Sequence, residues 1–243
     1  MNHGLYIAAA GLKSRSQTLE VAANNMANAS VAGYKRDMVF YNIFNRVEGS
    51  PLERALADSV VVEEASTDFS AGPLQRTDNP LDLALAADGF FAVQTEQGVR
   101  YTRNGQFTID SDRRLVNQMG QPLLNDNDRP IVLPPQGQIQ VGSRGDVSVD
   151  GVLAGRIQIV DFADKSQLTK TGGVLFQAAE GAEAQPPQNL SVKQGFLERS
   201  NVNPVDGLAD ALHNMRTFEM LARAMRMMSR DVDQKAINEI ARV

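Results

Sequence analysis

The stretch "SNVNPVDGLADAL", residues 200–212, has the features of a helix start. Asn203 suits the N-cap position, because its side chain can accept a hydrogen bond from one of the first free amides of a helix. Pro204 then occupies the first helical position, and Asp206 can approach the same exposed amides. No glycine or proline follows Gly207. The sequence therefore predicts one long, uninterrupted helix after residue 203.

Apolar side chains continue along this C-terminal segment at spacings of three and four residues, which is typical of an amphipathic helix. About 36 residues at about 1.5 Å each make a rod of roughly 50 Å, which one small domain cannot cover. Five of the nine methionines fall within residues 215–228, and they wrap more than one face of such a helix. Because methionine adapts to differing neighbours, this indicates packing against several of them. The alternative is a core formed within one chain.

The N-terminal segment has a second amphipathic pattern, over residues 3–30. Its seam is narrow and rich in small residues, with Arg15 as the one misfit, and Gly33 is expected to end the helix in the left-handed conformation. The members of this heptad pattern are Leu5, Ala8, Leu12, Leu19, Ala22 and Met26. Each terminal seam needs the other terminus or another molecule to cover it.

Three asparagines, Asn24, Asn25 and Asn28, lie near the end of the N-terminal helix. Asparagine is a mediocre helix former, because its amide competes for backbone groups. Three within five residues are more than a helix end needs, so we expect their amides to form further hydrogen bonds with partners outside the helix. A plain helix end is the alternative.

The middle of the chain has short alternating runs separated by turn pairs. Asn104-Gly105 is expected to join "VRYT" to "QFTI", Asp150-Gly151 to join "VSV" to "VLAGRIQIV", and Asp88-Gly89 to precede "FFAV". We therefore expect an α+β fold, in which long N- and C-terminal helices form a coiled-coil-like inner layer and the middle of the chain forms a mostly antiparallel β domain. The expected divisions are an N-terminal helix in 1–33, an extended linker or strand region in 34–69, a β body in 70–198 and a C-terminal helix in 199–243.

Composition limits the classes of function. The net charge of −5, and the absence of any Lys/Arg run longer than two residues, disfavour nucleic acid and anionic membrane as partners. The chain has no cysteine, and no apolar run approaches the roughly 20 residues that a membrane span needs. Its first residues lack the basic region of a cleaved signal peptide.

Residues suited to catalysis or metal binding are sparse. The two histidines, His3 and His213, lie at opposite ends of the chain and belong to no nucleophile motif. "NDNDRP" at 125–130 lacks the glycine and glutamate of a calcium loop, and "GSRG" at 142–145 lacks the lysine of a phosphate loop. Both are interpreted as turns. We expect no enzymatic activity, no cofactor, no metal site and no small-molecule substrate.

Three stretches resemble the flagellar basal-body rod and hook protein family. "LEVAANNMANASVAGYKRD" is similar to its N-terminal rod signature, and "GFLERSNVNPVDGLADALHNMRTFEM" is similar to its C-terminal signature. Residues 79–124, between them, are similar to the body domain of distal-rod and hook relatives. Met26 and Val31-Ala32 depart slightly from the family's pattern. The resemblance covers nearly the whole chain.

The resemblance implies a structural subunit whose terminal helices pack into an inner tube, with the β body outside it, in a rod that transmits torque from motor to hook. The implied partners are copies of the chain, proximal-rod and distal-rod subunits and the flagellar type III export apparatus. The implied location is the periplasmic rod, reached without a cleaved signal peptide. The residues expected to pack between subunits are Leu5, Leu12, Leu19, Asn24, Asn25, Met26, Asn28, Asn201, Asn203, Leu208, Leu212, Met215, Phe218, Met225, Met228 and Val232.

Three alternatives stay open. A distal-rod or hook-type axial subunit would share these features. A β-domain binding module for glycans, dimerised by a coiled coil, would need exposed aromatic side chains on one β face, yet the chain has no Trp and only four Tyr. A hydrolase is disfavoured by the scarcity of histidine.

Overall fold

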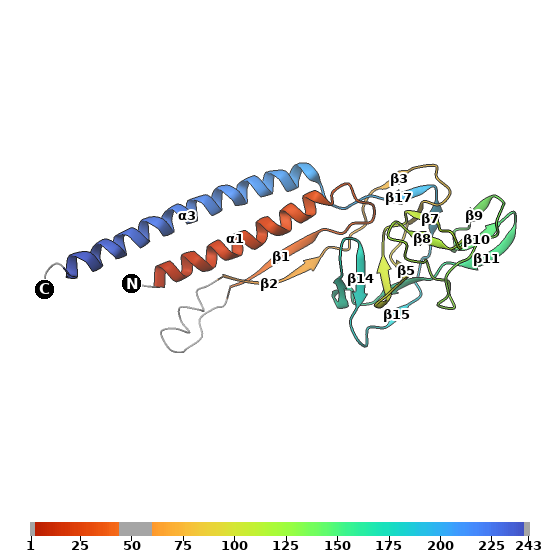
Figure 1. Ribbon diagram of the computed structural model, residues 1–243, viewed down its shortest axis with the longest axis horizontal. Helices are drawn as coiled ribbons and strands as arrows, with labels where there is room; N and C mark the ends of the chain where they lie inside the picture. Colours follow the sequence, from red (N-terminus) through yellow and green to blue (C-terminus); the bar gives the residue numbers. More distant parts are fainter. Residues whose placement is uncertain (1–2, 44–59, 241–243) are drawn as a thin grey trace. The chain divides into compact units, whose positions relative to one another are not determined.

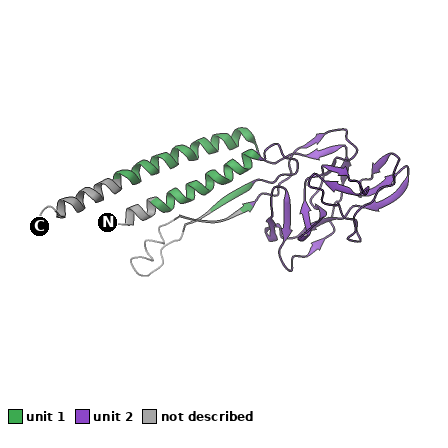
Figure 2. Cartoon of the chain, in the orientation of Figure 1, with its two compact units in different colours: residues 1–27, 37–66, 203–243 green, residues 28–36, 67–202 purple. Residues whose placement is uncertain are grey.

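The computed structural model describes residues 3–43 and 60–240. The chain divides into two compact units, which Figure 2 distinguishes by colour. Unit 1 contains residues 1–27, 37–66 and 203–243, and unit 2 contains residues 28–36 and 67–202. Both units are therefore discontinuous in the sequence.

The main feature of unit 1 is a pair of antiparallel helices, α1 (His3–Ala27) and α3 (Pro204–Ile240), which lie side by side in Figure 1. Small residues bring them together. A Cβ added at Gly11 would lie 3.8 Å from Leu221 Cδ1, and one at Gly207 would lie 3.5 Å from Met26 Cε. The expected packing of the two terminal helices is confirmed. Within the described residues, neither helix combines the length and apolar character that crossing a membrane requires.

Unit 1 also contains a two-stranded sheet of β1 (Asp37–Ile43) and β2 (Val60–Thr67). The α1 helix ends at Ala27, well before Gly33, so the prediction that Gly33 stops this helix was wrong. Gly33 does have a left-handed backbone, with φ of 68°.

The need for glycine at position 33 comes instead from close packing inside unit 2. A Cβ there would lie 2.2 Å from the amide nitrogen of Asn104 and 2.3 Å from the carbonyl carbon of Arg103. Real Cβ atoms do not approach backbone so closely, so any larger residue would push these two segments apart.

Unit 2 is built from short antiparallel strands. Its largest sheet has six strands in the order β13-β14-β6-β5-β12-β15, and a three-stranded sheet has the order β11-β10-β9. Three two-stranded sheets pair β16 with β4, β17 with β3 and β7 with β8. The elements are β3 (Leu74–Arg76), β4 (Leu83–Leu85), β5 (Phe90–Thr95), β6 (Gly98–Thr102), β7 (Phe107–Ile109), β8 (Leu115–Asn117), β9 (Ile139–Val141), β10 (Asp146–Val149), β11 (Val152–Arg156), β12 (Ile159–Phe162), the 3-10 helix η1 (Lys165–Gln167), β13 (Leu168–Lys170), β14 (Leu175–Ala178), β15 (Ala184–Gln185), β16 (Val192–Gln194) and β17 (Phe196–Glu198).

The β5 strand is covered on both faces, because successive side chains of a strand point to opposite sides. Phe90 packs in one apolar cluster, with its ring centroid 5.8 Å from that of Phe176. Phe91 packs in another, 5.5 Å from the ring of Phe107. This explains why "FFAV" forms a continuous apolar run without alternation.

The turn pairs gave one correct and one wrong hairpin. Asp150 and Gly151 both have positive φ and join β10 to β11, as expected. Asn104-Gly105 joins β6 to β7, but these strands belong to different sheets, so this hairpin prediction was wrong. Gly105 is required for another reason, since a Cβ there would overlap the carbonyl oxygen of Leu83.

Candidate subunit-packing surface

The start of α3 has the predicted cap. The Asn203 side-chain oxygen accepts a hydrogen bond from the amide of Val205 at 3.1 Å, and its side-chain nitrogen donates to Asp206 at 2.6 Å. The backbone oxygen of Asn203 accepts from the Gly207 amide at 2.9 Å, which is the first helical bond. The cap fixes where the helix begins.

One face of α3 contacts α1. Gly207, Asn214 and Leu221, spaced seven residues apart, follow this face. Arg15 Nη1 donates to Asn214 Oδ1 at 2.9 Å, so the residue that breaks the apolar seam of α1 has a polar partner on α3. Phe218, which falls on this face by helical spacing, is half-buried.

A second face of α3 is apolar and exposed. Val205, Leu208, Leu212 and Met215 follow the three-four-three spacing of a helical stripe, and their exposed fractions are 76%, 54%, 47% and 49%. We call these four residues the exposed stripe. At about 100° per residue it lies roughly a third of a turn from the face that contacts α1. Contiguous exposed apolar side chains of this kind typically mark an interaction surface.

Further methionines of α3 extend its apolar character to another side. Met220 and Met227 are 63% and 66% exposed, while Met225 is half-buried. The methionines therefore do lie on more than one face, as the sequence indicated. Packing against several neighbours stays a prediction.

The N-terminal candidates are less exposed than the stripe. Leu12, Leu19 and Met26 are half-buried in the single chain. The side chains of Leu5, Met228 and Val232 lie outside the described residues.

The asparagine cluster is used partly within the chain. Asn25 donates from Nδ2 to the backbone oxygen of Asp37 at 2.7 Å and accepts from the Asp37 amide at 2.9 Å. Its side chain thus pairs with β1 as a peptide group would. Asn24 is exposed, and the backbone oxygen of Asn28 accepts from the Val31 amide in the turn after α1. Contacts of these side chains with other subunits stay a prediction.

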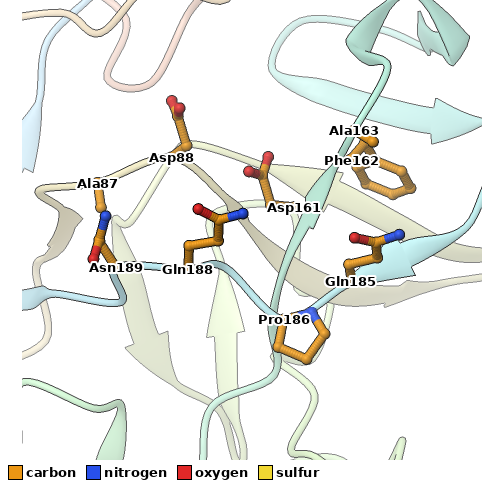
Figure 3. A pocket seen from close by; sticks show the side chains of 9 residues that line it. All are labelled: Ala87, Asp88, Asp161, Phe162, Ala163, Gln185, Pro186, Gln188 and Asn189. Carbon is orange, nitrogen blue, oxygen red and sulfur yellow. The ribbon is translucent and has the colours of Figure 1, made fainter.

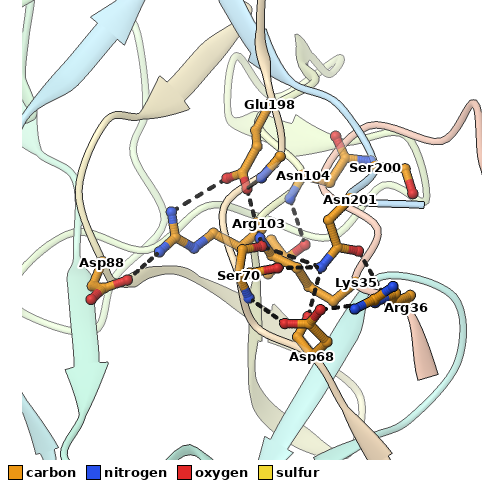
Figure 4. Close-up of polar contacts among 12 residues, drawn as sticks. Lys35, Arg36, Asp68, Ser70, Asp88, Arg103, Asn104, Glu198, Ser200 and Asn201 are labelled. Carbon is orange, nitrogen blue, oxygen red and sulfur yellow. Dashed lines mark hydrogen bonds and ion pairs between the residues drawn. The ribbon is translucent and has the colours of Figure 1, made fainter. Parts of the chain in front are cut away.

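Asn201 lies in a polar cluster of unit 2 (Figure 4). Its Nδ2 donates to the backbone oxygen of Asp68 at 2.8 Å and to Ser70 Oγ at 3.1 Å, and its Oδ1 accepts from the Arg36 amide at 2.8 Å. Its amide therefore connects separate segments of its own chain.

The same cluster contains a buried ion pair. Lys35 Nζ lies 2.6 Å from Glu198 Oε1, and both side chains are 1% exposed. Burial lowers the pKa of Lys35, against the opposing effect of the Glu198 carboxylate. Arg103 Nη1 lies 3.3 Å from Glu198 Oε2 and donates to the backbone oxygen of Ala87 at 2.9 Å.

The sequence analysis missed these charged residues. Lys35 and Glu198 are 163 positions apart, and each stands in an ordinary polar context. One signal was available: Lys35 lies between Gly33-Tyr34 and Arg36 inside one quoted signature, and Glu198 lies inside the other. No local pattern, however, indicates that a charge will be buried.

A hollow of about 420 Å³ in unit 2 contains two carboxylates, Asp88 and Asp161, among three amide side chains and Pro186 (Figure 3). Lys165 Nζ lies 3.2 Å from Asp88 Oδ1 and 3.9 Å from Asp161 Oδ1, so a cation of the same chain offsets their charge. Within the described part of the chain, no group of three or more potential ligands could hold a metal ion. This arrangement does not suggest acid-base catalysis.

Comparison with protein-family models gives three matches. Residues 5–35 match the model described as flagella basal body rod protein, and residues 193–239 match the C-terminal model of the flagellar basal body rod FlgEFG proteins. Residues 84–149 match the D1 domain of the flagellar hook proteins FlgE/F/G. The matches include the helical segments and part of unit 2.

Individual relatives are similar over almost the whole chain. The flagellar basal-body rod protein FlgF of Caulobacter vibrioides is 32% identical over 227 residues, covering 93% of each chain. FlgF of Salmonella typhimurium is 32% identical and covers 90% of this chain and 91% of its own. FlgG of Bacillus subtilis is 30% identical, with 90% and 92% covered.

Proposed function

Because the chain belongs to the family of flagellar basal-body rod proteins, we propose that it assembles with other rod subunits through the exposed stripe of α3. It is a structural subunit of the rod, and its family is not enzymatic. Its similarity to FlgF proteins supports that type of subunit, and FlgG proteins are also close. The neighbours in this proposal are copies of the chain and the proximal-rod and distal-rod subunits.

The single observation that carries the proposal is the exposure of the stripe. Leu208, Leu212 and Met215 are about half exposed in the chain by itself, although their spacing is that of a buried helix face. Burying one such side chain contributes about 1.5–3 kcal/mol. A rod repeats this contact at every subunit, so even a modest gain per contact would hold the assembly together.

Assembly in an open helical array follows from the use of different surfaces for different neighbours. The stripe and the face bearing Met220 and Met227 point in different directions around α3, which supports such an array. Transmission of torque through the array, a periplasmic location and delivery by the flagellar type III export apparatus are further parts of the proposal. These three rest on family membership alone.

The glycan-binding alternative has no comparable support. It requires exposed aromatic side chains on the β unit. Among the described residues of unit 2, every phenylalanine and tyrosine is buried or half-buried, and Phe90, Phe91 and Phe176 are at most 1% exposed.

The test is Leu212→Asp, introduced into the chromosomal gene of a motile strain. The variant should leave the purified chain soluble with an unchanged melting transition, because position 212 is already solvated. In the cell it should abolish swimming, since assembly would bury an unpaired carboxylate at every subunit at a cost of several kcal/mol. The readouts are soft-agar swimming, electron microscopy of basal bodies and an immunoblot for the protein.

The matched control is Leu212→Met, which keeps position 212 apolar and close to its original volume. It should swim normally. Normal swimming of Leu212→Asp would refute the stripe as a packing surface, and loss of the melting transition would show that Leu212 belongs to the fold of the chain itself.

A further inference from the structure

The chain passes between the two units four times, after residues 27, 36, 66 and 202. Inside unit 2, each passage adjoins one of three short segments: 28–36, which has a passage at both ends, the segment beginning at residue 67, and the segment ending at residue 202. All three segments meet at the polar cluster of Figure 4.

Glu198 is the centre of this cluster. Its Oε1 accepts from Lys35 Nζ at 2.6 Å and from the Gly72 amide at 2.8 Å, and its Oε2 is 3.3 Å from Arg103. Its backbone oxygen accepts from the Gly33 amide at 2.8 Å. One residue thus connects all three segments and, through Arg103, the body of the β unit.

Two further side chains reinforce the connection. Lys35 Nζ also donates to the backbone oxygen of Ser70 at 2.6 Å. Asn201 connects the same three segments a second time, since it bonds to Asp68, Ser70 and Arg36. Within unit 2, residues of all three segments are therefore joined by hydrogen bonds, and the bonds to the Glu198 carboxylate are buried. The bonds of Asn201 are part-buried or exposed.

Stability of the fold alone does not explain why these charged groups are buried. A buried ion pair is rarely more stabilising than apolar side chains of the same volume, because desolvation offsets the attraction between its charges. A hydrogen-bonded ion pair instead fixes the relative orientation of the groups that it joins, since each hydrogen bond accepts only a narrow range of geometries. A cluster of this kind suits a place where several strands of chain must keep one arrangement.

We infer that Glu198, Lys35 and Asn201 form a joint that fixes the four passages of the chain against one another. Force that enters unit 2 along any one passage is then shared among all of them. This role rests on the proposed function, because only a subunit within a rotating rod carries such force. Lys35 and Asn201 act as positioning residues, through Glu198 and through the backbone.

The first test is hydrogen exchange of the purified full-length Lys35→Met chain. Methionine keeps much of the side-chain length but lacks the ammonium group. Exchange at the amides of Gly33 and Arg36 should become at least tenfold faster, while exchange in β5 and β6 stays unchanged. Unchanged exchange at Gly33 and Arg36 would overturn the joint. So would an equal acceleration in β5 and β6, since the cluster would then support the whole unit and not the passages.

Two other variants keep this test decisive if Lys35→Met folds poorly. Asn201→Ala removes hydrogen bonds at a half-buried position without stranding a charge, and it should accelerate exchange at Gly33 in the same direction. Arg36→Ala is the matched control. It removes a charged neighbour of Lys35 whose ion pair with Asp68 is on the surface, with Arg36 48% exposed, and such pairs contribute little. Gly33 exchange in Arg36→Ala should remain within about twofold of the original.

The second test measures swimming speed at low and at high load. Lys35→Met and Asn201→Ala should assemble and swim in buffer, but their speed should fall at least twofold relative to the original strain in viscous methylcellulose medium, where the load is higher. Full speed under load in both variants would overturn the force-sharing role. The exchange measurement uses the unassembled chain, so failure of the joint is distinct from failure of the packing surface, which Leu212→Asp tests.

Discussion

The two units of this chain differ in how far they bury the side chains of their apolar stretches. In β5 of unit 2, the four side chains from Phe90 to Val93 are at most 1% exposed, and each face of the strand has its own cluster. In α3 of unit 1, Leu212 and Met215 are almost half exposed, although they follow an equally clear helical pattern. Unit 2 thus buries its central strand within one chain, although Val152 and Leu153 on β11 are exposed, whereas α3 of unit 1 leaves a whole apolar stripe exposed.

From this difference we expect folding and assembly to depend on different parts of the sequence. The β unit can reach its stable form within one chain. We expect the helical unit to be only weakly stable alone, because two helices with a narrow seam repay little of the ordering cost of about 1–2 kcal/mol per residue. Three measurements test this difference between the two units.

The largest difference should appear in hydrogen exchange of the monomer. We expect amides in α1 and α3 to exchange at least about ten-thousandfold faster than those in β5 and β6, because local opening is easiest where few apolar contacts are lost. The measurement is exchange followed by mass spectrometry at low protein concentration. Strong protection of both helices under these conditions would mean that the pair is stable alone, and the comparison would fail.

A smaller but sharper difference should follow from truncating one apolar side chain in each unit. Phe91→Ala should lower the free energy of unfolding of the β unit by about 3–5 kcal/mol, because it leaves a cavity in a closed core. Leu212→Ala should change it by less than about 0.5 kcal/mol, as expected for an exposed position. Chemical denaturation followed by near-ultraviolet circular dichroism gives both values, and similar losses would contradict the separation of the two units.

The smallest effects should come from glycine. Gly33→Ala combines a left-handed backbone with a contact of 2.2 Å to backbone, so it should destabilise unit 2 by more than about 1 kcal/mol. Gly207→Ala places its Cβ at an ordinary 3.5 Å from Met26, and it should raise helix content, since alanine favours a helix by about 0.8–1.0 kcal/mol over glycine. Far-ultraviolet circular dichroism measures the second change, and a loss of helix would show that Gly207 is needed for close packing in the monomer.

Much of the fold could be predicted because its signals are local. The cap at Asn203, the uninterrupted C-terminal helix and the Asp150-Gly151 hairpin each depend on a few consecutive residues, and all three are confirmed. The Asn104-Gly105 hairpin was wrong because a turn pair specifies a local bend and not the sheet to which the next strand belongs. The prediction for Gly33 was wrong for a similar reason, since Arg103 and Asn104, which lie against it, are far away in the sequence.

The candidate site was only partly within reach of the sequence. Helical spacing identified Leu208, Leu212 and Met215, but spacing alone could not separate them from Phe218, which falls on the face toward α1. The contacts with α1 decide this division, because they show which face of α3 is covered within the chain. The cluster around Glu198 was out of reach, since its members are brought together only by the tertiary fold.

The discontinuity of the two units has a consequence for how such chains can vary. Residues 67–202 form an insert between β2 and α3, and its entry and exit are tied to each other at Asp68 and Asn201. A Cβ added at Gly151 or Gly172 would meet no atom within 4 Å, so these turns have open space around them, although the positive φ of both glycines disfavours a side chain at these two positions. Loops there can lengthen or diverge during evolution while the helices keep their spacing.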